Sequence, residues 1–118
     1  MLTDIRERGI LKKVRVIARR TLRAFSEIHT DSTDALNTWY FEARNAVWEN
    51  PADIKKKYRS ASILKKGRVV FNINGNKYRL LCFVNYEQKI VYIKFIGTHK
   101  AYNAITMEDY DGDPVKGS

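Results

Sequence analysis

Residues 68–81 read Arg68-Val-Val-Phe-Asn-Ile-Asn-Gly-Asn-Lys-Tyr-Arg-Leu-Leu81 and carry the clearest structural pattern of the chain. Apolar and polar residues alternate on both sides of Asn74-Gly75, as in two half-buried strands. Asn-Gly is the preferred pair for a two-residue type I′ turn, because both positions need a positive φ. The sequence therefore predicts a hairpin of strands 68–74 and 77–85. Its facing pairs are Ile73 with Asn76, Asn72 with Lys77, and Val70 with Arg79.

A third strand is predicted over residues 90–96, after a turn near Glu87-Gln88. Side chains alternate between the two faces of a sheet. One face is therefore apolar and consists of Val69, Phe71, Ile73, Tyr78, Leu80, Cys82, Val84, Val91, Ile93 and Phe95. The opposite face collects Arg68, Asn72, Lys77, Arg79, Tyr92 and Lys94. Ile96 then lies opposite Arg79, so His99 emerges beside Arg79 and Lys77, whereas a slip of one residue would bury the arginines.

Two helices are predicted before the hairpin. A short edge strand over residues 12–17 leads into a helix over 19–29, with an apolar stripe of Ala18, Leu22, Phe25 and Ile28. Ser32 or Thr33 is expected to cap the second helix, which runs through Trp48. Its stripe of Leu36, Trp39, Tyr40, Ala43 and Val47 indicates core packing. Asn50-Pro51 ends this helix, since proline disfavours helical geometry in the preceding residue, and a basic connector over 52–66 follows.

These elements predict an α+β fold in which two N-terminal helices pack on one face of a small antiparallel sheet. We expect an N-terminal extension over residues 1–14, a domain over 15–107 and an acidic tail over 108–118. No apolar run approaches the roughly 20 residues that cross a bilayer, and charges interrupt the N-terminal segment where a signal peptide would be apolar. With Cys82 as the single cysteine, we expect a cytoplasmic protein without disulfides or membrane partners.

The 118-residue chain has a formal net charge of +9, and this charge is unevenly distributed. Residues 54–100 carry 12 basic side chains against Glu87 alone, for a net charge of +11. A solvated surface normally mixes the two signs, so this block indicates a binding surface for a polyanion such as RNA. The alternative is a basic domain that binds no polyanion.

The polar sheet face suggests a site for cutting RNA without a metal. Such a reaction needs groups that remove and supply protons and groups that stabilise charge on the phosphate. His99 and Tyr102 are the candidates for proton transfer, with Arg79 at the phosphate. Further candidates for binding RNA or phosphate are Arg68, Asn72, Lys77, Tyr92, Lys94, Lys57 and Arg59. Alternatively, His99 is a surface or capping residue and Tyr102 a lid over the sheet edge.

Metal and thiol chemistry fit the sequence poorly. Glu87 is the only carboxylate between residues 54 and 107, whereas two-metal catalysis needs several that converge. The tail segment Asp109-x-Asp111-Gly112-Asp113 faintly matches a calcium loop, but the chain ends before the bidentate glutamate. Cys82 lies on the apolar face, where it packs as a hydrophobic residue. We expect no metal and no cofactor.

Several blocks of residues 15–106 are similar to one known family. They are Arg15-Val-Ile with the following helix, the segment from Trp39 through Trp48-Glu-Asn-Pro-Ala-Asp-Ile-Lys55, Ser60-Ala-Ser, residues 68–79, and Val91-Tyr-Ile-Lys-Phe-Ile-Gly-Thr-His-Lys-Ala-Tyr102. In combination they resemble the HigB family of bacterial type II toxins, within the RelE-like superfamily of mRNA interferases. The resemblance implies two helices on an antiparallel sheet, with RNA chemistry around Arg68, Lys77, Arg79, His99 and Tyr102. Asn103 and Thr106 stand where relatives often have acidic residues, so a carboxylate that orients the histidine would be missing.

The resemblance also implies partners and an activity. A toxin of this kind cuts mRNA on translating ribosomes, is held inactive by a helix-turn-helix antitoxin, and reaches operator DNA only through that antitoxin. We therefore predict a ribosome-dependent, metal-free endoribonuclease that inhibits translation. One alternative is a module that binds RNA or the ribosome without cutting. A second is a regulatory partner that acts only within a DNA-bound complex, although no helix here pairs basic residues with a helix-turn-helix pattern.

Overall fold

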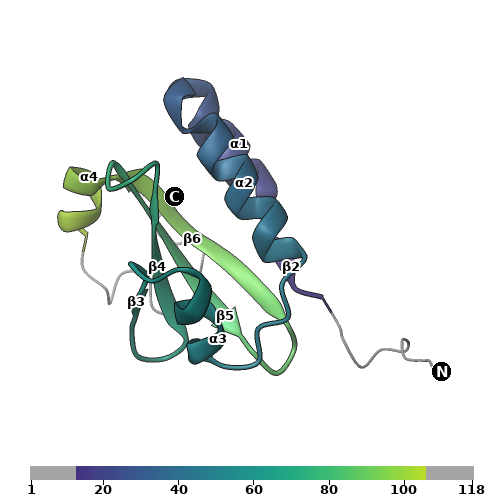
Figure 1. Cartoon of the computed structure of the whole chain (residues 1–118). Coiled ribbons are helices and arrows are strands. Elements are labelled where there is room, and N and C mark those ends of the chain that lie inside the picture. Colours follow the sequence, from purple (N-terminus) through teal and green to yellow (C-terminus); the bar gives the residue numbers. More distant parts are fainter. Residues whose placement is uncertain (1–12, 106–118) are drawn as a thin grey trace.

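The computed structural model describes residues 13–105 (Figure 1). Its helices are α1 (Arg19–Ile28), the 3₁₀ turn η1 (Thr30–Ser32), α2 (Thr33–Arg44), α3 (Pro51–Lys57) and α4 (His99–Asn103). Its strands are β2 (Arg15–Ile17), β3 (Ser62–Ile63), β4 (Arg68–Ile73), β5 (Tyr78–Asn85) and β6 (Ile90–Thr98). The predicted acidic tail and residues 1–12 of the predicted extension lie outside the described residues. Val14, at the end of that extension, is buried in the core.

The strands form one sheet in the order β2-β6-β5-β4-β3. The neighbours from β6 to β3 are antiparallel, whereas β2 runs parallel to β6. The sheet is therefore mixed. The sequence-based prediction of a purely antiparallel sheet is wrong in this respect. The predicted α+β class is confirmed, and Figure 1 shows α1 and α2 side by side against the sheet.

The main core lies between these helices and the predicted apolar face of the sheet. Trp39 of α2 packs edge-on against Phe71 of β4, with ring centroids 5.3 Å apart. The apolar-face residues in this core are Val69, Phe71, Ile73, Tyr78, Leu80, Cys82, Val84, Val91 and Ile93. Two residues of the predicted helical stripes are instead exposed. Ile28 is 80% exposed at the end of α1, and Val47 is 37% exposed because α2 ends at Arg44.

Phe95 was predicted on the helix-covered face, and this is wrong. Cys82 of β5 pairs with Ile93, but Leu81 pairs with Phe95, so β6 holds Lys94 as an extra residue in a β-bulge. One inserted residue exchanges the faces for the rest of the strand. Phe95 therefore joins a second, smaller apolar cluster on the other face of the sheet. That cluster contains Val70, Leu81, Leu64, Phe95, Tyr102 and Ile105, and it brings α4 against the sheet.

The hairpin loop is two residues longer than predicted. Asn74 and Gly75 do have positive φ angles of 56° and 68°, but the strands close through Ile73 and Tyr78, and Asn72 faces Arg79. A register shift of two residues leaves every side chain on its predicted face. Contacts with Asp31 hold this wider loop, because the Asn74 side chain donates to its main-chain carbonyl and the Tyr78 hydroxyl to its carboxylate.

Asn50-Pro51 starts a helix here, whereas the sequence had predicted that it only ends one. Asn50 is the N-cap of α3, and its side chain accepts a hydrogen bond from the Asp53 amide at 3.1 Å. Proline at the first helical position fits this role, since its missing N–H would have no helical partner. The predicted connector therefore contains α3 and β3. Ser32 is the N-cap residue of α2 as predicted, but it makes no capping hydrogen bond, because its hydroxyl donates back to the His29 carbonyl at 2.7 Å.

None of the helices in residues 13–105 has the length and apolar character needed to cross a bilayer.

Candidate active site

Arg79 is the centre of a polar cluster on the sheet face that α1 and α2 leave open. It lies on β5, between Asn72 of β4 and Gly97 of β6. Its Nη1 atom donates to the Asn72 side-chain oxygen, and also to Asn76 Oδ1 at 2.6 Å. Its Nη2 atom is 3.0 Å from His99 Nε2. The guanidinium is therefore held in one orientation by three neighbours.

His99 is placed by the end of β6 and the start of α4. The Thr98 hydroxyl caps α4 by accepting from the Ala101 amide at 3.0 Å. The His99 amide donates to the Lys77 carbonyl in the hairpin loop at 3.3 Å. The predicted juxtaposition of His99 with Arg79 is therefore present, although the β-bulge puts Gly97, and not Ile96, opposite Arg79.

The contact between Arg79 and His99 sets the role of the ring nitrogen. A guanidinium only donates hydrogen bonds. Nε2 of His99 is therefore unprotonated in this contact, and its lone pair accepts the hydrogen bond from Arg79. The same lone pair can accept a proton from a substrate hydroxyl if a phosphate draws the guanidinium toward itself. A half-buried base beside a fixed cation is an arrangement suited to acid–base chemistry on a phosphodiester.

Tyr102 follows His99 by three residues on α4, so both side chains lie on neighbouring parts of one helical face. The Tyr102 ring packs near Phe95, with centroids 6.2 Å apart, and is half-buried in the second apolar cluster. Its placement is thus fixed by packing beside the histidine. Neither its predicted role in proton transfer nor the lid alternative is decided by this geometry.

Asn72 connects the cluster to the chain that follows α3. Its Nδ2 atom donates to the Ser60 carbonyl at 3.1 Å while its oxygen accepts from Arg79. Arg59, which precedes Ser60, is exposed in this turn. Lys57 is also exposed, and its amino group is 3.7 Å from the Glu42 carboxylate. Of these two predicted RNA contacts, Arg59 is therefore next in sequence to a residue of the cluster, whereas Lys57 is directed toward α2.

Three other predicted residues gather at the opposite end of the sheet. Arg68 faces Phe83 across the strands, and its Nε atom donates to the Lys65 carbonyl at 3.0 Å. The Tyr92 ring lies 5.9 Å from the Phe83 ring. Lys94 was predicted to be an accessible phosphate contact, but it is only 7% exposed and its amino group lies over Phe83 at 5.6 Å. The bulge at Lys94 explains this correction.

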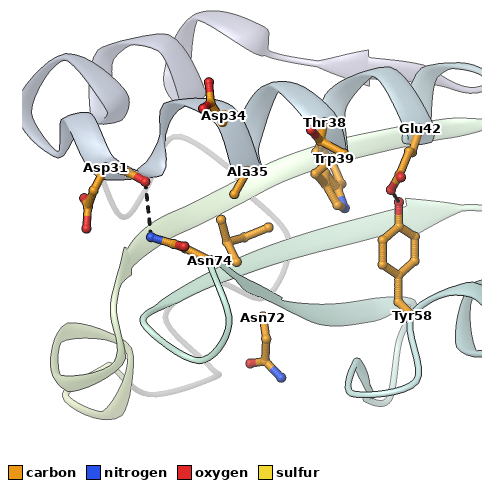
Figure 2. A pocket seen from close by; sticks show the side chains of 10 residues that line it. Asp31, Asp34, Ala35, Thr38, Trp39, Glu42, Tyr58, Asn72 and Asn74 are labelled. Carbon is orange, nitrogen blue, oxygen red and sulfur yellow. Dashed lines mark hydrogen bonds between the residues drawn. The ribbon is translucent and has the colours of Figure 1, made fainter.

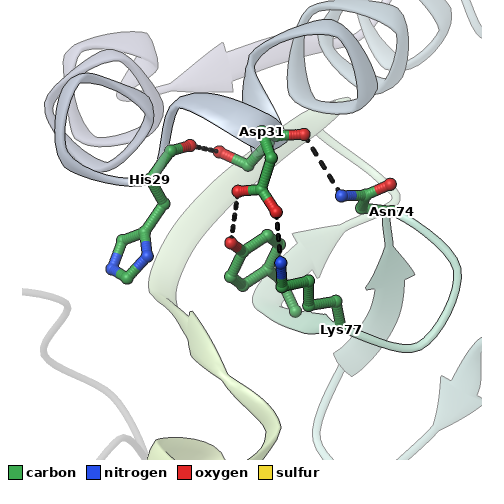
Figure 3. Close-up of polar contacts among 6 residues, drawn as sticks. His29, Asp31, Asn74 and Lys77 are labelled. Carbon is green, nitrogen blue, oxygen red and sulfur yellow. Dashed lines mark hydrogen bonds and ion pairs between the residues drawn. The ribbon is translucent and has the colours of Figure 1, made fainter.

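Lys77 was predicted on the open face, but its amino group turns toward the helices. The Asp31 carboxylate accepts from the Lys77 amino group (Figure 3). Its other oxygen accepts from the Tyr78 hydroxyl at 2.5 Å. The hydrogen bond from Lys77, and then that from Tyr78, lowers the pKa of Asp31. The hydrogen bond to Asp31 in turn raises the pKa values of Lys77 and Tyr78. Only the Lys77 carbonyl faces His99.

The sequence-based prediction missed Asn76 and Asp31. Asn76 contacts Arg79 directly, and its place beside the Asn74-Gly75 turn was the available clue. Asp31 lies in the polar break between the helices, 46 residues from Lys77, and no local pattern marks it. Asn76 belongs to the hairpin loop and contacts Arg79, whereas Asp31 binds the same loop from the helical layer.

Burial raises the pKa of the Cys82 thiol, which fits its predicted packing role. In residues 13–105, no three His, Cys, Asp or Glu side chains are grouped so that they could hold a metal ion.

Comparison with protein families decides the relationship. A family model described as HigB_toxin, the RelE-like toxic component of a toxin-antitoxin system, matches residues 32–105. The chain belongs to the HigB toxin family. The match includes Asn72, Asn76, Arg79, His99 and Tyr102 of this HigB-family protein and begins after α1. A search of curated proteins found no match.

Membership in this family makes the protein a toxin of a toxin-antitoxin system, and a cognate antitoxin is its implied partner.

Proposed function

We propose that this HigB-family toxin is an endoribonuclease that cuts mRNA on the translating ribosome without a metal ion. The Arg79–His99 contact carries the proposal, because it fixes a donor of positive charge 3.0 Å from a nitrogen that can accept a proton. The face around it lies within the strongly basic block of the sequence. Such a face attracts the phosphate backbone without reading its sequence.

In the proposed reaction, His99 Nε2 takes the proton of a ribose 2′-hydroxyl as the 2′-oxygen attacks the adjacent phosphorus. The bond from phosphorus to the 5′-oxygen breaks, and a protonated group supplies a proton to that oxygen. Tyr102 is our candidate for this donor. Arg79 stabilises the charge that builds up on the phosphate oxygens. The products are a 2′,3′-cyclic phosphate, which can open to a 3′-phosphate, and a 5′-hydroxyl end.

Recruitment to the ribosome agrees with the small size of the cluster. A ribosome that already holds the mRNA supplies the positioning that a larger nuclease would have to provide itself. Arg59 and Arg68 then serve as peripheral contacts to the backbone on either side. We further propose that the protein acts in the cytoplasm. There a helix-turn-helix antitoxin would hold it inactive and carry it to operator DNA.

Primer extension on a defined mRNA tests the proposal, with the protein added to purified translating ribosomes or to naked RNA containing EDTA. We expect cuts that need the ribosome and persist in EDTA. His99→Ala should lower the cleavage rate by about 10²- to 10⁴-fold and Arg79→Ala by about 10²- to 10³-fold. His29→Ala, which removes the other histidine of the chain, and Arg44→Ala, on the surface of α2, are the matched controls.

Each outcome has a distinct meaning. Full cleavage by folded His99→Ala and Arg79→Ala proteins would place the chemistry elsewhere. Growth arrest with intact mRNA would instead support a translation inhibitor that binds without cutting. Thermal unfolding of each variant, compared with the parent protein, separates loss of activity from loss of structure.

A further inference from the structure

A groove with a volume of about 490 Å³ lies between α2 and the end of β4 (Figure 2). One wall is formed by side chains that α2 presents at successive turns: Asp34, Thr38 and Glu42. The other wall includes Tyr58, Ile73 and Asn74, with Asp31 at one end, whereas the Asn72 side chain points away from α2 (Figure 2). Asn72 therefore borders the groove, while its side chain contacts Arg79 on the other side of β4.

The charge of the groove is opposite to that of the protein. Its lining contains three carboxylates, from Asp31, Asp34 and Glu42, and no lysine or arginine, although the chain as a whole carries +9. Asp31 already pairs with Lys77. Glu42 already accepts from the Tyr58 hydroxyl and pairs with Lys57. The Asp34 side chain is exposed and makes no hydrogen bond or ion pair with any residue in the described range. The groove therefore offers a carboxylate that is free to pair with a cation.

Trp39 is a second feature of the groove, because it brings an unpaired hydrogen-bond donor there. Its side chain lines the groove and is only 2% exposed, yet its Nε1–H has no acceptor among the described residues. Figure 2 shows the indole pointing from α2 toward the strands, between Ala35 and Glu42. Buried donors are normally hydrogen-bonded. A main-chain carbonyl that entered the groove and shifted the indole slightly would supply the missing acceptor.

We propose that this groove receives a segment of the cognate antitoxin that carries lysine or arginine side chains. The family supplies the partner, the unpaired Asp34 supplies the charge that selects a basic segment, and Trp39 supplies a donor for its main chain. A segment seated there lies beside β4 at Asn72, whose side chain points away from the groove and contacts Arg79. A bound segment would then affect the cluster around Arg79 through β4, without covering His99.

The affinity of the full-length toxin for its cognate antitoxin, measured by calorimetry at several salt concentrations, tests the proposal. Asp34→Lys combined with Thr38→Arg places two cations on the α2 wall of the groove. We expect the Kd to rise about tenfold and its salt dependence to decrease. Asn37→Lys is the matched control, because Asn37 is exposed on the same helix but lines a different hollow. Its Kd should stay within about twofold of the parent value.

Cross-linking with a carbodiimide identifies the contact directly, since it joins carboxylates to lysines that touch them. We expect a link from Asp34 to an antitoxin lysine, and reversal of that lysine to glutamate should restore binding to Asp34→Lys. Rescue of this kind separates a direct contact from misfolding of the variant. Unchanged affinity of the double variant would overturn the proposal, as would a rescue that fails. Loss of self-association with unchanged antitoxin binding would also overturn it and assign the groove to a second copy of the chain.

Neither experiment measures RNA cleavage, so its result is independent of the proposed enzymatic activity.

Discussion

Gly97→Ala is expected to destabilise the protein through a single steric contact beside the candidate site. Gly97 lies on β6 opposite Arg79, two residues before His99. A Cβ atom at this position would lie 2.6 Å from Cζ and 3.1 Å from Cε2 of Phe95. Ordinary carbon–carbon contacts are about 3.5–4.0 Å. The phenyl ring would therefore have to move by about 1 Å.

The Phe95 ring has little room for such a shift. It packs with the buried Val70 and Leu81 side chains and faces the Tyr102 ring at 6.2 Å. Overpacking of this kind typically costs about 1–3 kcal/mol. With a urea m-value of about 1–3 kcal/mol/M, the unfolding midpoint should fall by roughly 1 M at an unchanged m-value. Because the ring supports α4, we also expect slower mRNA cleavage than in the parent protein.

A double-mutant cycle in urea shows whether the ring is the cause. Phe95→Leu provides a smaller side chain, so Gly97→Ala should cost much less when it is added to that variant. Gly75→Ala is the control, since its Cβ would meet no atom within 4 Å but its φ of +68° is unfavourable for alanine. It should cost about 1–2 kcal/mol in either background. Equal costs for Gly97→Ala with and without Phe95 would refute the steric explanation.

Three further predictions concern charge, orientation and capping. Because the pKa of Asp31 is lowered in the folded protein, its stabilising contribution is complete above the ordinary value of 3.8 and is lost as the pH falls through the folded pKa. The difference in urea midpoint between the parent protein and Asp31→Asn should therefore shrink below about pH 4. Arg79→Lys keeps the charge but cannot reach its three partners together, so single-turnover cleavage should slow by at least about tenfold while RNA binding in a filter assay stays within about threefold. Asn50→Ala should lower the free energy of unfolding by about 1 kcal/mol, measured in urea, through loss of the α3 cap.

The sequence predicted the faces of the hairpin better than its pairing. The Asn74-Gly75 turn correctly located the loop, but the contacts with Asp31 that widen it come from a distant part of the chain. The error in pairing was two residues, and side chains alternate with a period of two. Phe71 and Arg79 therefore stayed on opposite faces, and the core residues of the hairpin were predicted correctly.

The β-bulge had the opposite consequence, because it shifts the strand by one residue. The predicted pairing of β5 with β6 holds from Asn85 to Cys82 and fails beyond it. Phe95 then changes faces and Lys94 becomes buried, and no feature of the alternating apolar pattern marks the position of the extra residue. The predicted position of His99 survived because a displacement of one residue along β6 still leaves it next to Arg79.

Asn50-Pro51 shows a different limit of local patterns. The residue before proline avoids helical geometry, and this property suits both the end of one helix and the N-cap of the next. Only the Asn50 side chain, which accepts from the Asp53 amide, distinguishes the two cases. The basic residues that follow are therefore on a helix and not on a loose connector.

The loop over residues 74–77 explains why the candidate site was only partly predictable. One side of the loop is bound to Asp31, through the Asn74 amide and the Lys77 amino group. The other side carries Asn76 to the Arg79 guanidinium and the Lys77 carbonyl to the His99 amide. The orientation of Arg79 and His99 therefore depends on Asp31 in the helical layer. Asp31 acts on them through the loop, because none of its hydrogen bonds within residues 13–105 goes to either residue. The strand pattern alone identifies Arg79 and His99. Their relative orientation depends on the contacts that join the hairpin loop to the helical layer.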